Sequence, residues 1–184
     1  MTMKKILRAL AASIIVLGAS SCFGDNESYF TPAAFYVPIL IQNQDEANLL
    51  DTTTVHNWAD STIILTYKDK TYKSEDAPEM TTTDMKLGKY DMYNTYSTKT
   101  VKVLAFGMFE GIDDIDNDLV LTWPDNSSDI IHLKNKGTWA KSGKGFTSLE
   151  RWIKLNGEDV LSELVVVTKT VKGEEPDGSA AAEE

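Results

Sequence analysis

The sequence predicts an all-β protein, in which a single domain folds as an antiparallel β-sandwich of the immunoglobulin-like type. Three observations lead to this prediction. Short segments rich in β-branched and aromatic residues recur along the middle of the chain. Turn-forming residues separate these segments, and no stretch keeps the three-and-four spacing of apolar residues that an amphipathic helix needs. Short strands joined by tight turns are typical of a sandwich.

The first predicted strands are residues 34–42 and 61–67. Residues 34–42 are rich in strand formers, but Pro38 lacks the N–H that a sheet requires and therefore indicates an edge strand or a bulge. After the second segment, residues 68–70 supply a turn into residues 71–73. We therefore expect these two segments to form a hairpin.

The second half of the chain holds further strand patterns, which are residues 100–106, 118–123, 129–134, 151–155 and 164–169. Residues 124–127, Pro-Asp-Asn-Ser, favour a turn between two of these strands and predict a hairpin. Asn156-Gly157 is the strongest hairpin pattern, because both positions of a type I′ turn need a positive φ. Residues 147–155 also fit one short helix, but the Asn-Gly turn favours a strand there.

The N-terminal residues have the layout of an export signal. Lys4, Lys5 and Arg8 precede an apolar run at residues 9–19, which is shorter than the roughly twenty residues of a membrane-spanning helix. Small residues then lead to Cys22, the single cysteine of the chain. We expect a signal peptide at residues 1–21, a tether at 22–31, the β domain at 32–172 and a disordered acidic tail at 173–184.

The segment Ala19-Ser20-Ser21-Cys22 resembles the lipobox of bacterial lipoproteins, although Ala19 stands where leucine is usual. The resemblance implies that the Cys22 thiol receives a diacylglyceryl group, with chains such as palmitate. Each buried CH₂ of an acyl chain contributes ~0.8 kcal/mol, so two or three chains hold a protein on a bilayer. The alternative is a secreted protein cut near Ala19, which would leave an unexplained free thiol in an oxidising compartment.

Residues 23–27, Phe-Gly-Asp-Asn-Glu, are similar to the acidic export signal of surface lipoproteins of the Bacteroides group. This resemblance implies the outer membrane, with the cell surface favoured over the periplasmic leaflet. The alternative is a tether that is acidic by chance. Residues 44–51 and 121–129 also resemble small Bacteroides-type outer-membrane lipoproteins of unknown function, which carry an "NLLD" element and a later hairpin with tryptophan. That family implies an all-β extracellular domain and supplies no catalytic residue.

The charge of the chain narrows the choice of partners. The net charge is −10, and the loss of residues 1–21, which hold three basic residues and no acidic one, would make it −13. Nucleic acids and anionic headgroups both favour a basic face, so neither is expected as a partner of the domain. No cofactor is indicated.

Metal sites are not expected. Asp114, Asp116 and Asp118 in the loop Asp113–Asp118 match positions one, three and five of a calcium-loop template. The template then needs glycine and glutamate at positions that Leu119 and Asp125 occupy, so a solvated loop is favoured. The only histidines, His56 and His132, are too far apart in sequence to indicate a zinc site.

Four residues are candidates for a role at the surface. Trp58 and Trp139 lie in expected loops with polar neighbours and could stack on a glycan, the alternative being aromatic rings folded over the end of the sandwich. Thr52 and Ser61 each follow an aspartate and resemble acceptors of protein O-glycosylation in the same bacterial group.

The favoured interpretation is a lipid-anchored, non-enzymatic protein of the outer membrane that binds a glycan, a protein or another envelope component. No nucleophile elbow, HExxH helix or phosphate loop occurs. One alternative is an envelope hydrolase that uses paired carboxylates, since acidic residues are abundant. A structural role in a surface appendage is a third possibility, which unpaired sheet edges would favour.

Overall fold

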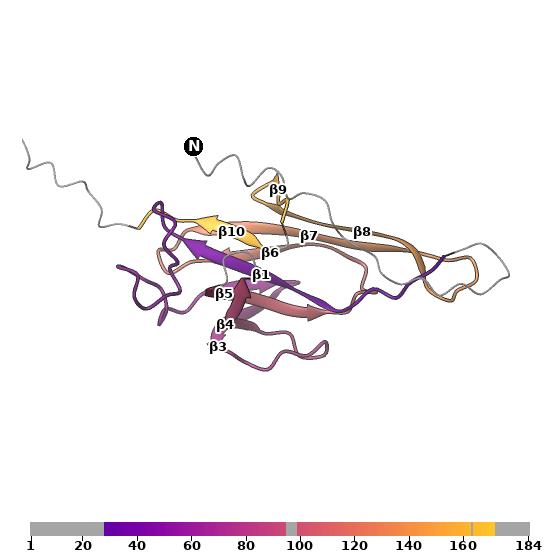
Figure 1. Ribbon diagram of the computed structural model, residues 1–184, viewed down its shortest axis with the longest axis horizontal. Coiled ribbons are helices and arrows are strands. Elements are labelled where there is room, and N and C mark those ends of the chain that lie inside the picture. Colours follow the sequence, from indigo (N-terminus) through magenta and orange to yellow (C-terminus); the bar gives the residue numbers. More distant parts are fainter. Residues whose placement is uncertain (1–27, 95–98, 163, 172–184) are drawn as a thin grey trace, which may run out of the picture.

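The computed structural model describes residues 28–94, 99–162 and 164–171, and these residues form ten strands and no helix. The strands belong to one sheet with the order β10-β1-β5-β4-β3-β2-β6-β7-β8-β9 (Figure 1). Their bounds are β1 Phe35–Gln42, β2 Ile64–Tyr67, β3 Lys70–Asp76, β4 Leu87–Asn94, β5 Lys99–Phe109, β6 Ile115–Thr122, β7 Ser128–Trp139, β8 Phe146–Leu155, β9 Glu158–Asp159 and β10 Val165–Thr168. No helix that could span a membrane is found in these ranges.

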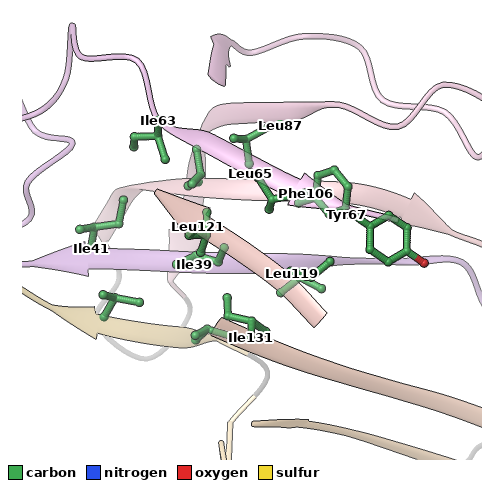
Figure 2. Packing of buried hydrophobic residues seen from close by; sticks show 14 of the residues in the cluster. Ile39, Ile41, Ile63, Leu65, Tyr67, Leu87, Phe106, Leu119, Leu121 and Ile131 are labelled. Atoms are coloured by element: carbon green, nitrogen blue, oxygen red, sulfur yellow. The ribbon is translucent and has the colours of Figure 1, made fainter. Parts of the chain in front are cut away.

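The sheet curls around one hydrophobic core, so that strands far apart in its order face each other. Figure 2 shows side chains from β1, β2, β5, β6 and β7 pointing toward one another. Ile39, Leu65, Phe106, Leu121 and Ile131 in this cluster are fully buried. Alternation of buried and exposed residues along β6 and β7 puts one face of each strand into this core, as the period of two predicts.

The prediction of an all-β protein is confirmed, but the arrangement is not an antiparallel sandwich of two separate sheets. β1 pairs with β10 and β3 pairs with β4 in the parallel direction. The β3–β4 pair also joins what would otherwise be two sheets into one curled half-barrel. Parallel strands are joined by long connections rather than by tight turns, so a turn-based prediction finds only the antiparallel pairs.

The predicted hairpins are present. Lys68 and Asp69 join β2 to β3 with φ values of +47° and +61°, and Asn156 and Gly157 join β8 to β9 with +50° and +90°. Asn126, with φ of +64°, lies in the turn between β6 and β7. Left-handed values at both central positions are the geometry of a type I′ turn. Residues 147–155 belong to strand β8, so the helical alternative is wrong.

Pro38 lies within β1, where its missing N–H is accommodated. β10 pairs with β1 only from Ile39 onward, so the described structure places a single strand partner beside Pro38. The register with β5 also shifts between Phe35 and Val37. The irregularity thus precedes the proline and its extra residue is on β5, while Pro38 pairs regularly with Ala105 and β1 lies between two strands rather than at an edge.

One polar cluster is buried beside the core. The carboxylate of Asp129 in β7 accepts hydrogen bonds from Trp123 Nε1 at 2.5 Å and from Asn156 Nδ2 at 2.7 Å. It also forms an ion pair with Lys169, whose Nζ donates to Ser127 Oγ at 3.0 Å. Asp129 and Lys169 are 8% and 9% exposed. Burial opposes the ionisation of Asp129, but the hydrogen bonds outweigh it and hold the pKa of this carboxyl below its usual value.

Two features of the sheet ends matter below. β7 and β8 form a long hairpin that extends past the other strands (Figure 1). Before β1, Phe30 pairs with Phe146 at the outer end of this hairpin. On the other side of β8, β9 pairs only with Lys154 and Leu155.

Candidate functional site

A hollow of about 320 Å³ opens between the β2–β3 hairpin and the loop that joins β5 to β6. Tyr67, Tyr72 and Phe109 form its aromatic floor, in which Tyr72 is half-buried while Tyr67 and Phe109 are buried beneath it, 4% and 1% exposed. Charged residues of both signs line it as well, with Lys68 and Lys70 from the hairpin and Asp113 and Asp114 from the loop.

The aromatic floor is fixed by the core beneath it. The ring of Tyr67 packs edge-on against Phe106 at 5.7 Å and against Phe109 at 5.8 Å between centroids, and Tyr72 contacts Phe106 at 4.9 Å. In Figure 2, Tyr67 lies at the end of the core with its hydroxyl pointing away from the other side chains. Because these rings also hold the sheet together, they form a preorganised surface rather than a mobile one.

The polar groups of the hollow have separate roles. Burial, together with nearby Tyr67 and Asp84, raises the pKa of the Tyr72 hydroxyl, so this group stays protonated and can donate a hydrogen bond. The carboxylate of Asp113 accepts the N–H of Glu110 at 3.0 Å and so closes its own turn. Lys68 and Asp114 are exposed. An aromatic floor with donors and acceptors around it suits a small polar molecule that has one apolar face, such as a sugar ring.

A second group of interacting side chains lies on the outer face of β6, β7 and β8. His132 contacts Asp116 through Nε2 at 3.0 Å and Asp118 through Nδ1 at 2.6 Å. Trp152 lies 5.2 Å from the His132 ring, and the ammonium group of Lys134 lies 5.4 Å from the Trp152 ring. These charges are already paired across the strands, which is the usual role of such side chains on a solvated sheet face.

The acidic segment that resembles a calcium loop is largely strand. Asp116 and Asp118 belong to β6 and contact His132, so the extended backbone there does not provide the loop that the calcium template needs. Among the described residues, no group of three or more histidine, cysteine or acidic side chains is arranged to hold a metal ion.

The structure separates the two candidate tryptophans. Trp58 is 8% exposed and stacks on Trp123 with 6.1 Å between ring centroids, so the expectation that its ring is free to stack on a glycan is wrong. Within its loop the N–H of Trp58 donates to the Leu49 carbonyl at 2.6 Å, and the N–H of Leu49 donates to Ile41 of β1 at 2.8 Å, which holds the loop against the sheet. Trp139, in contrast, is 57% exposed.

The other predicted sites have mixed outcomes. Thr52 is exposed in a loop and Ser61 is half-buried, with its carbonyl accepting a hydrogen bond from Lys89 at 2.9 Å. Their O-glycosylation stays a prediction. Cys22, the signal peptide and the acidic tail lie outside the described residues.

Sequence reasoning did not identify the hollow. It interpreted Tyr67 and Tyr72 as strand residues on either side of a turn, which they are, but it could not place Phe109 beneath them. The sequence held one local indication of this hollow, which is that a tyrosine lies on each side of the charged turn residues 68–70, at positions 67 and 72. The third ring comes from β5, and only the curl of the sheet brings it near.

Comparisons with known proteins give no further guide, since no protein-family model, no curated protein and no solved structure matches this chain.

Proposed function

We propose that the protein is a non-enzymatic binding module of the cell envelope, anchored to the outer membrane by lipid at Cys22. In this proposal the domain faces the cell surface and holds a sugar-like ligand in the hollow. The curled sheet then has the role that an immunoglobulin-like sandwich has elsewhere, as a rigid frame that presents loops at one end. The observation that carries the ligand assignment is the partly exposed Tyr72 ring, supported from below by the buried Tyr67 and Phe109, among charged residues of both signs.

The lipid anchor is supported by the sequence. The basic start, the apolar run and the small residues before the single cysteine form one consistent pattern. Intact-mass spectrometry of the processed chain tests the anchor directly, because acyl chains on Cys22 add a defined mass. An unmodified sulfur on the processed chain would contradict it.

The alternative is a hydrolase in which Asp113 and Asp114 form the carboxylate pair, because both line the hollow. Against this alternative, Oδ2 of Asp113 already accepts the N–H of Glu110, and Asp114 is exposed to solvent. In a two-carboxylate hydrolase one of the pair usually lies in an environment that excludes water. We therefore favour binding over hydrolysis.

A glycan array with the processed chain tests the ligand class, followed by titration calorimetry on the sugars that bind. We expect Tyr72→Ala to weaken binding about tenfold, the effect of losing about 1.4 kcal/mol of ring contact and hydrogen bonding. Tyr93→Ala is the matched control, because Tyr93 is 61% exposed on β4 and does not line the hollow. Equal binding by both variants, or cleavage of the sugar that Asp114→Asn abolishes, would contradict the proposal.

A further inference from the structure

The outer end of the β7–β8 hairpin carries exposed aromatic side chains that the core does not use. We define the hairpin tip as residues 139–146 together with Tyr29 and Phe30, which lie beside them. Trp139 is 57%, Tyr29 50% and Phe30 36% exposed. Large aromatic rings gathered at one exposed end of a domain are characteristic of an interaction site.

The aromatic rings of the tip are held in place. Phe146 is 2% exposed, and its ring stacks on Trp139 with 4.1 Å between centroids. Phe146 also covers Gly137, where a Cβ would lie 2.2 Å from the phenylalanine ring, so only glycine fits there. Backbone hydrogen bonds of 3.0 and 2.9 Å join Phe30 and Phe146 in both directions. The tip is therefore a built surface, in which Trp139 projects from a fixed base.

The charge of the tip differs from that of the whole chain. The protein is acidic, yet residues 135–149 contain three lysines and no acidic residue. Lys141 and Lys144 are exposed in the turn that joins the two strands. Asp25 and Glu27 precede Tyr29 and partly offset these lysines, so the aromatic rings would supply the larger share of any binding energy.

Only a short stretch of sequence separates the tip from the residue proposed to carry the lipid. Cys22 precedes Tyr29 by seven residues. A fully extended chain spans at most ~3.6 Å per residue, so a seven-residue connection allows a separation of at most about 25 Å between the anchor and the tip. Figure 1 shows the described chain beginning beside the outer end of the β7–β8 hairpin. Since this step uses the anchor, it rests on the proposed function.

We propose that the hairpin tip docks into the headgroup layer of the membrane to which Cys22 is attached. Tryptophan and tyrosine favour the membrane–water interface, where an apolar ring meets lipid and its polar atom meets water. Lys141 and Lys144 would contact lipid phosphates from the same turn. A lipid chain fixes only the distance of the domain from the bilayer, whereas a docked tip also fixes its orientation.

Quenching of tryptophan fluorescence by brominated lipid tests this docking. The processed chain, residues 22–184, is coupled through the Cys22 thiol to a maleimide lipid in phosphatidylcholine vesicles with 30% phosphatidylglycerol. Cys22 is the only cysteine, so the coupling site is unique. Because this link is chemical, the test holds whether or not cells acylate the residue, and a failed anchor is recognised separately by intact mass.

We expect brominated vesicles to reduce the emission by the share of one tryptophan of the four. Trp139→Phe should abolish this quenching, and Trp152→Phe, the matched control on the outer face of β8, should retain it. Lys141→Gln combined with Lys144→Gln should weaken the quenching. Absence of quenching in the coupled wild-type protein, or quenching that persists in Trp139→Phe, would overturn the proposal.

Discussion

A tryptophan, a carboxylate and a lysine interact in two places in the molecule, once in a buried cluster and once on the outer face of the sheet. In the buried cluster, Trp123 donates to Asp129, and Lys169 pairs with that carboxylate and lies 5.2 Å from the Trp123 ring. On the outer face, Trp152 donates to Glu150 at 3.0 Å, and Lys134 pairs with Glu150 at 2.8 Å. Both lysines approach the face of their tryptophan, so the contacts alone do not distinguish the two clusters.

The difference between them is solvent. Asp129 is almost completely buried, whereas the Glu150 side chain is 53% exposed. An exposed pair exchanges one hydrated state for another and contributes little, but a buried charge that loses its partner has no water to replace it. The comparison teaches that burial, rather than the identity of the paired groups, decides how much each cluster matters for folding.

The largest difference in stability between the buried and the outer cluster is expected when their tryptophans are replaced. Trp123→Ala should reduce the free energy of unfolding by about 4 kcal/mol, because it removes a buried ring and leaves a cavity in the core. Trp152→Ala should cost less than about 1 kcal/mol, since its ring is only partly buried. Urea denaturation followed by circular dichroism measures both values. Equal losses would show that the outer cluster contributes to the core.

The second largest difference in stability is expected when the carboxylates of the two clusters are replaced. Asp129→Ala should cost about 3 kcal/mol, because Lys169 then remains as a buried charge without its partner. Glu150→Ala should leave the midpoint of urea denaturation nearly unchanged. A double variant with Lys169→Met should recover part of the stability lost in Asp129→Ala, since it removes the stranded charge. No recovery would contradict the role assigned to the ion pair.

The smallest effect on stability is expected when the pH is lowered. The pKa of Asp129 is lower in the folded protein than in the unfolded chain, so its ionised form stabilises the fold. This contribution is complete above about pH 4, the unfolded value, and is lost as the pH falls through the lower folded value. The melting temperature of the wild-type protein should therefore fall more steeply below pH 4 than that of Asp129→Asn. Parallel curves would contradict this assignment.

Much of the fold could be predicted because adjacent residues in the sequence determine the geometry of the turns. Lys68-Asp69 and Asn156-Gly157 adopt the left-handed geometry that closes hairpins, and the strands beside them have the expected alternation. β4 was missed, because Gly88 is its second residue and it contains no β-branched residue. Its place in the sheet depends on β5 and on a parallel pairing with β3, which no local pattern encodes.

The candidate site was less predictable for the same reason. Trp139 was expected in a loop, where it could be exposed or folded over the sandwich end; it is 57% exposed but lies at the end of strand β7. Trp58 has similar neighbours but is buried, because its loop folds onto Trp123, which is distant in the chain. The hollow needs Tyr67, Tyr72 and Phe109 from three strands. Local patterns therefore failed at the positions where contacts between distant segments determine burial and the place of the hollow.

Because β9 is short, it has a consequence for the association of neighbouring copies of the protein. Only Lys154 and Leu155 of β8 are covered by it, so most of this strand presents an open edge within the described structure. Such an edge invites another copy to add its own strand, which is how fibrils grow. Arg151 counters this, because its charged guanidinium is held on this strand, 3.7 Å from the Phe35 ring and with Nε donating to Asn135 Oδ1 at 2.7 Å. A strand added beside β8 would meet this fixed positive charge, which disfavours growth of a polymer along the edge.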